Sequence, residues 1–390
     1  MANAITNDAA RAMIETARAL VPQLRERRLE TDELRRVPDA SVSELRKLGI
    51  LGLATPRENN GSDLGPDVIF EVAMELARGC GSTAWCGGNW AIHGLLGSMF
   101  APETQREIFD VAEFPIISTG FSPLRGSTQP VDGGALISGH WDFASGVDHA
   151  DWVVVMAIGA QGPLAHLVPR AELEIVDTWH TSGLRGTGSK DVAATGLFVP
   201  ERRLLTMVAP GEGHSVGREM YESPWFRVPM GSVFGCGVIG SILGMARGAL
   251  EVFVERTAKK VGGLSGVKVG ARADVHHRIG EAAAEIDAAV VFVRNMFAEI
   301  RRYGADELEY TTLDRVRWRR DAAWGARSAV RAVNLLFEVG GAHVLWLDDQ
   351  LHQFQRDITA ASHHYGMAWS TLFNGYGRAA LGLDPEVAMI

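Results

Sequence analysis

The sequence predicts an α+β protein in which a central antiparallel β domain separates two helical domains, the second of them a four-helix bundle. Three features carry this prediction: helical spacing of apolar residues early in the chain, short apolar runs in the middle, and long helical stretches at the end. At 390 residues the chain is long enough for two or three domains. We expect the N-terminal helical domain at 1–112, the β-barrel or sandwich domain at 113–210 and the helical bundle at 211–390.

The first part of the chain has the apolar periodicity of amphipathic helices. Apolar residues recur three and four positions apart in 13–20 and again in 68–77. Asp39 and Ser41 are candidate N-caps of a further helix, and Pro102 is suited to the first turn of a short exposed one. This part is therefore expected to be helical throughout.

The sequence pattern changes near residue 114, where apolar residues begin to occur in short runs separated by Gly, Pro and Asp. Such runs are typical of strands that end in turns. The clearest ones lie at 135–138, 152–158, 165–168, 173–176 and 192–199.

The last part of the chain predicts long helices, at about 228–260, 270–302, 312–338 and 350–378. Gly240, Gly244 and Gly248 lie four residues apart, so a second helix can pack closely there, as in a helical bundle or a tetramer core. The stretch 235–240 also fits the dinucleotide pattern G-x-G-x-x-G, but no βαβ unit surrounds it, and we reject that interpretation.

Composition narrows the possible partners and the cellular location. The net charge of −9 argues against nucleic acid, because phosphate binding needs a basic face. Three scattered cysteines without a CxxC motif fit a reducing compartment. We see no signal peptide, no membrane span and no metal-ligand spacing, so we expect a cytoplasmic protein without a metal site.

Several segments, in order along nearly the whole chain, are similar to signatures of the acyl-CoA dehydrogenase superfamily. They are Leu45–Pro56, Ala77–Trp85, Ser182–Ser189, Phe198–Glu201, Glu338–His343 and the pair Arg356-Asp357. The resemblance implies a fold with N-terminal helices, a β domain and a C-terminal helical bundle.

Two departures separate this chain from the dehydrogenases of that superfamily. Their catalytic carboxylate is missing at both family positions, which here are 362–366 and the neighbourhood of Phe234, so α-proton removal lacks its acceptor. Their Thr-Glu-Pro loop is replaced by 121–127. The chain instead resembles the oxygenase components of two-component flavin monooxygenases of the 4-hydroxyphenylacetate 3-hydroxylase type.

That resemblance implies a reaction and its partners. Reduced FMN or FAD would come from a separate NAD(P)H:flavin reductase, react with O₂ to a flavin hydroperoxide, and hydroxylate a phenolic, indolic or polycyclic aromatic substrate. A homotetramer is implied as well. Nitrogen or sulfur oxygenation, an acyl-CoA dehydrogenase with a displaced base, and a non-catalytic flavin-binding protein are the alternatives.

Three residues are the expected catalytic groups. His364, or its neighbour His363, stands where the dehydrogenases carry a base, and an imidazole titrates near neutrality. His93 is suited to orienting a polar group of the substrate. Ser145, followed by Gly146, is the expected partner of the flavin N5 atom.

Five further residues are expected to contact the flavin or line the pocket. Ser118 and Trp141 are expected in the same pocket as His93, and Arg185 lies in a loop rich in backbone donors. Arg256 and Lys259 are expected to pair with a flavin phosphate across a subunit interface.

Overall fold

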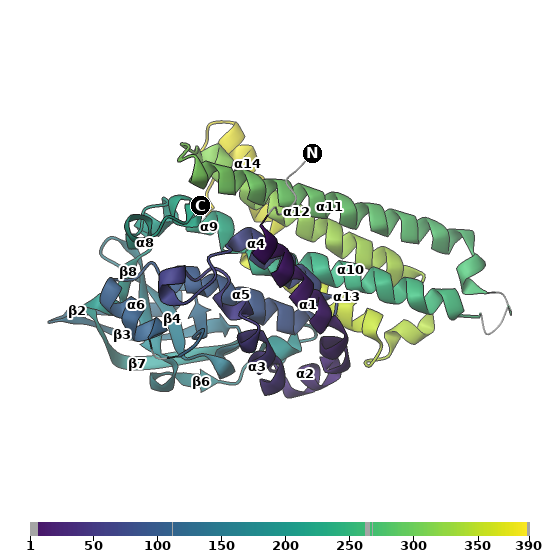
Figure 1. Ribbon diagram of the computed structural model, residues 1–390, viewed down its shortest axis with the longest axis horizontal. Coiled ribbons are helices and arrows are strands. Elements are labelled where there is room, and N and C mark those ends of the chain that lie inside the picture. The colour runs from purple at the N-terminus through teal and green to yellow at the C-terminus, as the bar shows by residue number, and fades with distance from the viewer. Residues whose placement is uncertain (1–6, 111, 262–265, 267, 388–390) are drawn as a thin grey trace.

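The computed structural model describes residues 7–110, 112–261, 266 and 268–387. Helices fill the chain up to residue 109, strands lie between 117 and 206, and helices follow from 208 onward. The β domain forms one end of the molecule, and the long C-terminal helices extend away from it (Figure 1). The expected order of helices, strands and helices is confirmed.

The N-terminal helices surround two buried ones. Every residue of α4 is buried, and so is nearly every residue of α5. Pro102 opens its helix as expected, but the N-cap expectations for Asp39 and Ser41 are wrong: Pro38 precedes that helix, and both residues lie inside it. The helices are α1 (Asp8–Glu26), α2 (Arg28–Leu34), α3 (Asp39–Lys47), α4 (Pro66–Ala77), α5 (Gly81–Gly97) and α6 (Pro102–Phe109).

The β domain consists of two four-stranded sheets, ordered β1-β4-β5-β8 and β2-β3-β7-β6. The strands are β1 (Ile117–Gly120), β2 (Gly126–Val131), β3 (Gly134–Ala144), β4 (Trp152–Gly159), β5 (Gly162–Pro169), β6 (Glu174–Val176), β7 (Lys190–Pro200) and β8 (Leu204–Thr206). The pairs are antiparallel except β1 with β4, which is parallel. A bulge between Trp141 and Ala144 disturbs the pairing of β3 with β7 just before the chain leaves the sheet.

The C-terminal helices build the bundle. They are α7 (Val208–Gly211), α8 (Val216–Met220), α9 (Met230–Val233), α10 (Cys236–Lys259), α11 (Ala273–Ala305), α12 (Thr312–Glu338), α13 (Gln350–Ser362) and α14 (Trp369–Ala380). The single helix expected at 350–378 is wrong, because α13 ends at Ser362 and a turn containing Tyr365–Met367 precedes α14. This break places His364 outside any long helix.

The bundle is joined to the N-terminal domain by a close contact between α10 and α4. A Cβ atom on Gly240 would lie 2.4 Å from the carbonyl oxygen of Phe70, and one on Gly244 would lie 2.2 Å from that of Met74. The glycines four residues apart therefore let two backbones touch within one chain. Residues 230–259 are apolar and long enough to cross a membrane, but 78% of their most apolar window is buried inside the protein.

Gly244→Ala should lower the melting temperature, because its new methyl group meets main-chain atoms that cannot turn away. Overpacking of this kind costs about 1–3 kcal/mol. Gly280→Ala on α11 is the matched control, since no atom lies within 4 Å of the added Cβ. That variant should be neutral or slightly stabilised, by about 0.5–1 kcal/mol, through the better helix propensity of alanine. Equal melting temperatures of the two variants by calorimetry would contradict the close contact.

Candidate active site

Helix α5 supplies two aromatic side chains to the site. Trp85 and His93 lie eight residues apart, which is about 12 Å along the helix axis and about 80° around it. Both are nearly buried, with exposures of 6% and 3%. They therefore mark the two ends of one stretch of the α5 surface, and each contacts a different part of the β domain.

His93 presents a neutral hydrogen-bond acceptor. Its Nδ1 lies 2.6 Å from the carbonyl oxygen of Ile117, and since a carbonyl only accepts, Nδ1 carries the hydrogen and donates. Burial lowers the pKa of His93 to about 4, against the opposing effect of the Ile117 carbonyl, so Nε2 keeps a free lone pair at pH 7. Phe234 stacks on the imidazole at a centroid distance of 5.2 Å, and Phe121 meets Phe234 edge-on.

Ser145 lies directly after β3, where its hydroxyl joins two parts of the protein. The indole Nε1 of Trp85 donates to Ser145 Oγ over 3.2 Å, and Ser189 Oγ lies 2.7 Å from the same atom. The backbone N–H of Ser145 donates to Phe143, and its hydroxyl, bonded to Trp85 and Ser189, keeps one hydrogen-bonding position for a ligand. Ser118 on β1 donates to the carbonyl oxygen of Ser145 over 2.9 Å and fixes its position.

A relay of hydrogen bonds ties this serine to helix α13. The buried carboxylate of Asp357 accepts the backbone N–H of Leu184 over 2.6 Å. Leu184 begins a turn with a φ of 51°, and its carbonyl accepts the hydroxyl of Thr187 over 2.9 Å. Thr187 Oγ1 lies 2.7 Å from the hydroxyl of Ser189, which in turn contacts Ser145. Two of the segments that resemble superfamily signatures, Ser182–Ser189 and Arg356-Asp357, thus meet at the carboxylate of Asp357.

His364 follows α13 and packs edge-on against Trp85, with ring centroids 5.4 Å apart. The N–H of Gly366 donates to His364 Nδ1 over 3.1 Å, so in the neutral ring the hydrogen lies on Nε2. The free Nε2 of His364 is therefore a hydrogen-bond donor, whereas the free Nε2 of His93 is an acceptor. The neighbouring His363 uses its Nδ1 on the carbonyl of Thr359 and does not share this contact.

The electrostatic environment of His364 favours the uncharged ring. Desolvation by the dense surroundings lowers the pKa of His364, and the positive charge of Arg319 on α12 lowers it further. The side chain nevertheless stays accessible to solvent in the single chain. A group in dense surroundings that solvent can still reach is typical of a cavity mouth.

The structure does not bring all the sequence-predicted residues together. Trp141 is fully buried between the sheets and donates to Met156, which gives it no surface for a flavin. Ser118 is equally buried and holds the Ser145 carbonyl instead of lining a pocket. Arg185 donates to the carbonyl of Asp32 on α2, so it joins domains. All three side chains bond to other parts of the protein, and their contact with the flavin or its pocket stays a prediction.

Arg256 lies far from this group, near the end of α10. Helices α5 and α10 run in opposite directions, since Gly81 packs against Met245 and Gly88 against Gly237. Trp85 therefore lies beside residue 240 or so of α10, and the helix rise from there to Arg256 is about 24 Å. The guanidinium pairs with Asp349, while its Nε and Nη2 are buried without a hydrogen-bond partner in the described part of the chain. Two orphaned N–H groups on a cation are suited to a phosphate or carboxylate.

Sequence reasoning missed two neighbouring aromatic residues. Phe143 has a φ of 65°, an outlier for a bulky residue, and is 64% exposed. Its ring meets Trp179 edge-on at 6.1 Å. Only the place of Phe143, two residues before Ser145, signals its role, because the backbone twist at the β3 bulge cannot be read from the sequence.

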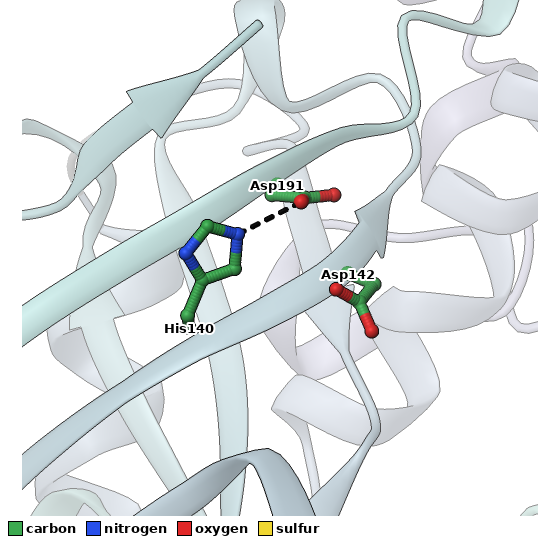
Figure 2. A group of neighbouring side chains, drawn as sticks. All are labelled: His140, Asp142 and Asp191. Carbon is green, nitrogen blue, oxygen red and sulfur yellow. Dashed lines mark hydrogen bonds and ion pairs between the residues drawn. The ribbon is translucent and has the colours of Figure 1, made fainter. Parts of the chain in front are cut away.

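A second polar group lies on β3 and β7, shown in Figure 2. The ligand-type atoms of His140, Asp142 and Asp191 all lie within 4.8 Å of one another. His140 contacts Asp191 at 2.8 Å, and Arg125 donates to Asp142 at 3.0 Å, so both carboxylates already have partners. We interpret the group as an ion-pair cluster that joins the two strands.

A cavity with a volume of about 380 Å³ lies elsewhere, between α1, α2 and the start of α13. Its lining residues are Val21, Pro22, Arg25, Glu26, Arg28 and Gln350. The group around Ser145 is instead open in the single chain, since both Phe143 and His364 are exposed. The chemical groups, and not the volume of this cavity, identify the candidate site.

The two helical parts of the chain match family models. Residues 7–109 match the acyl-CoA dehydrogenase N-terminal domain, and residues 237–369 match the acyl-CoA dehydrogenase C-terminal domain. Among curated proteins, the chain is 32% identical to the flavin-dependent monooxygenase oxygenase subunit HsaA of Mycobacterium tuberculosis over 95% of each chain. It is 30% identical to the FADH₂-dependent resorcinol hydroxylase, oxygenase component, of a Rhizobium species, over 92% of this chain and 91% of that protein.

Solved structures give the same relationship. The 3-HSA hydroxylase of a Rhodococcus species superposes with a TM-score of 0.92 at 31% identity, covering 97% of this chain and 98% of that one. XiaF from a Streptomyces species, solved with FADH₂ and glycerol, superposes with a TM-score of 0.90 at 25% identity, covering 98% of both chains.

Asp357→Asn should change how stability depends on pH. Burial raises the pKa of Asp357 to about 7, against about 3.9 in an unfolded chain, so the stability contributed by this group is lost as pH rises between those values. Asparagine still accepts from Leu184 but does not titrate. The melting temperature of the variant relative to wild type should therefore increase from pH 5 to pH 8. The exposed Asp132→Asn is the control, and parallel curves for wild type and Asp357→Asn would refute the buried ionisation.

Proposed function

Since the chain belongs to the acyl-CoA dehydrogenase family, in the branch of flavin-dependent monooxygenase oxygenase components, we propose that its own substrate is a phenolic aromatic compound. The protein is a flavin-dependent monooxygenase that uses reduced flavin and O₂. This confirms the expected oxygenase function over α,β-dehydrogenation, for which both family base positions lack a carboxylate. As the oxygenase component of a two-component system, it receives reduced flavin from a separate reductase.

The residues around Ser145 fit a flavin ring. Bound reduced flavin, with O₂, supplies the oxygen atom that the substrate gains. The linked hydroxyls of Ser145 and Ser189 offer a hydrogen-bond partner at the edge of a ring. The exposed ring of Phe143, beside Trp179, offers a flat apolar surface for its face. We propose that the flavin lies here, against the end of β3.

His93 is the proposed proton acceptor for the substrate, and its hydrogen-bonding pattern is the observation that carries the phenol proposal. The bond to Ile117 leaves Nε2 as a neutral acceptor among Phe234 and Phe121, where a small aromatic ring can pack. A phenol loses its hydroxyl proton as the ring gains oxygen, so an acceptor at this place helps. Oxygenation of a thioether sulfur removes no proton, and a buried acceptor favours phenols over such substrates.

His364 is proposed to donate a hydrogen bond, which reverses the role expected from the sequence. Its Nδ1 is occupied by the N–H of Gly366, so the free position is Nε2–H. Because it packs on Trp85, which also donates to Ser145, the His364 donor belongs to the flavin side of the site. The pair of histidines would then work with opposite polarity, one accepting from the substrate and the other donating beside the flavin.

A homotetramer is proposed on two observations. The Arg256 guanidinium, whose Nε and Nη2 lack a partner among the described residues, lies too far along α10 to contact a flavin bound at Ser145 of the same chain. It would instead bind the phosphate of a flavin held by a neighbouring subunit. The loop before α13 exposes Leu345, Trp346 and Leu347 at 62%, 61% and 75%, an apolar patch of the kind that assembly covers. We also propose a cytoplasmic location, where reduced flavin is available.

The function is tested by supplying a flavin reductase, NADH and O₂ with a panel of phenols, indoles and sulfur heterocycles. At least one phenol should gain one oxygen atom, detected by mass spectrometry with ¹⁸O₂, at a higher yield per NADH than the other classes. Catalase is included so that peroxide released into solution cannot oxidise the panel. Sulfoxide formation with no phenol turned over would contradict the proposed substrate class.

Variants of the two histidines separate their roles. His93→Ala should slow oxygen transfer to a phenol by about 10²–10⁴-fold, the usual cost of losing a general base. His364→Ala should instead lower the product formed per reduced flavin, with more H₂O₂ released, in single-turnover experiments. His363→Ala is the control and should resemble wild type, since its ring bonds only to Thr359 among the described residues. A larger loss of transfer rate in His364→Ala than in His93→Ala would reverse the assignment.

A further inference from the structure

The turn that carries His364 contacts a group that the proposed function leaves unexplained, the guanidinium of Arg319. Arg319 lies on α12 and is only 8% exposed. Its Cζ lies 5.7 Å from the ring centroid of Tyr365, the residue that follows His364. Helix α12 thus directs a buried positive charge at the turn that carries the histidine, on a helix that supplies none of the other site residues.

Protonation of His364 is opposed from two independent directions. Arg319 holds a fixed charge over the ring of Tyr365, the next residue, because a guanidinium keeps its proton even when buried, and this charge lowers the pKa of His364. The N–H of Gly366 points at Nδ1, so a hydrogen on Nδ1 would face a hydrogen donor and cost that bond. The other described groups at the ring are Trp85 from α5 and, on its own segment, His363 and Tyr365, none of them an acidic residue.

We propose that Arg319 is a positioning residue that keeps His364 uncharged, so that the ring offers one defined donor, Nε2–H, to the flavin side of the site. An imidazolium there would be an acid that delivers a proton where oxygen is being activated, and peroxide loss would compete with transfer. The proposal rests on the proposed function only for the role of His364. The charge relation between the two residues stands without it.

Hydrogen–deuterium exchange at the histidine ring carbon, read by mass spectrometry against pH, measures this relation without any turnover. A His363→Gln background leaves His364 as the exchanging ring of its peptide. In the parent protein, which carries His363→Gln and keeps Arg319, the half-exchange pH of His364 should lie below 6.5, the ordinary pKa of histidine. Arg319→Met should raise this half-exchange pH by about one unit. Arg319→Lys retains a charge and should stay close to the parent. Arg327→Met is the matched control, since Arg327 covers the Trp369 ring from the same helix at 4.4 Å.

Several outcomes would overturn the proposal. A parent half-exchange pH at or above 6.5 does so without any variant, and so does an Arg319→Met curve that coincides with the parent. If Arg319→Met does not fold, Arg319→Gln takes its place. If the half-exchange pH of His364 shifts as much in Arg319→Lys as in Arg319→Gln, Arg319 has a packing role only. In turnover, product per reduced flavin should fall at pH 6 in Arg319→Met and recover by pH 8. A shifted exchange curve with unchanged product yield would retain the charge relation and refute the proposed role of His364.

Discussion

The candidate site depends on one hydrogen bond, from the N–H of Leu184 to the buried carboxylate of Asp357. That bond fixes a turn whose hydroxyls reach Ser145, and Ser145 in turn receives the indole N–H of Trp85. Trp85 packs on His364, which follows the same helix that carries the carboxylate. The site is therefore a ring of contacts that begins on α13, passes through the β domain and α5, and returns to the turn that follows α13. Such closure holds each polar group in one orientation, as preorganised donors require.

The two histidines show how backbone contacts decide the chemistry of a side chain. Both rings have a lowered pKa, so both are neutral, and the neutral ring has one donor and one acceptor. A carbonyl at His93 and an N–H at His364 occupy Nδ1 in opposite senses. The free nitrogens consequently differ in polarity although the residues are identical. Residue type alone could not have shown that one ring offers an acceptor and the other a donor.

The order of helices, strands and helices could be predicted from the sequence, because periodicity and ordered signatures extend along the chain. The proposed functions of Ser145, His93 and His364 stay predictions. The tautomers of the histidines could not be predicted, since a tautomer is set by neighbours that are distant in sequence. The buried position of Trp141 could not be predicted for a related reason: period-two alternation predicts that successive side chains lie on opposite faces of a strand, but not which face is the core. The end of α13 was also missed, because local propensity continues through residues that the turn at Tyr365 interrupts.

The glycine contact between α10 and α4 also matters while the protein is being made. Met74 and Gly244 are 170 positions apart in the sequence, yet their backbones meet. At translation rates of 5–20 residues per second, the buried helix α4 leaves the ribosome roughly 10–30 s before α10 exists. During that interval α1 and α5 can cover α4, but the face of α4 that packs on α10 has no partner. A chain truncated before α10 would leave that face exposed.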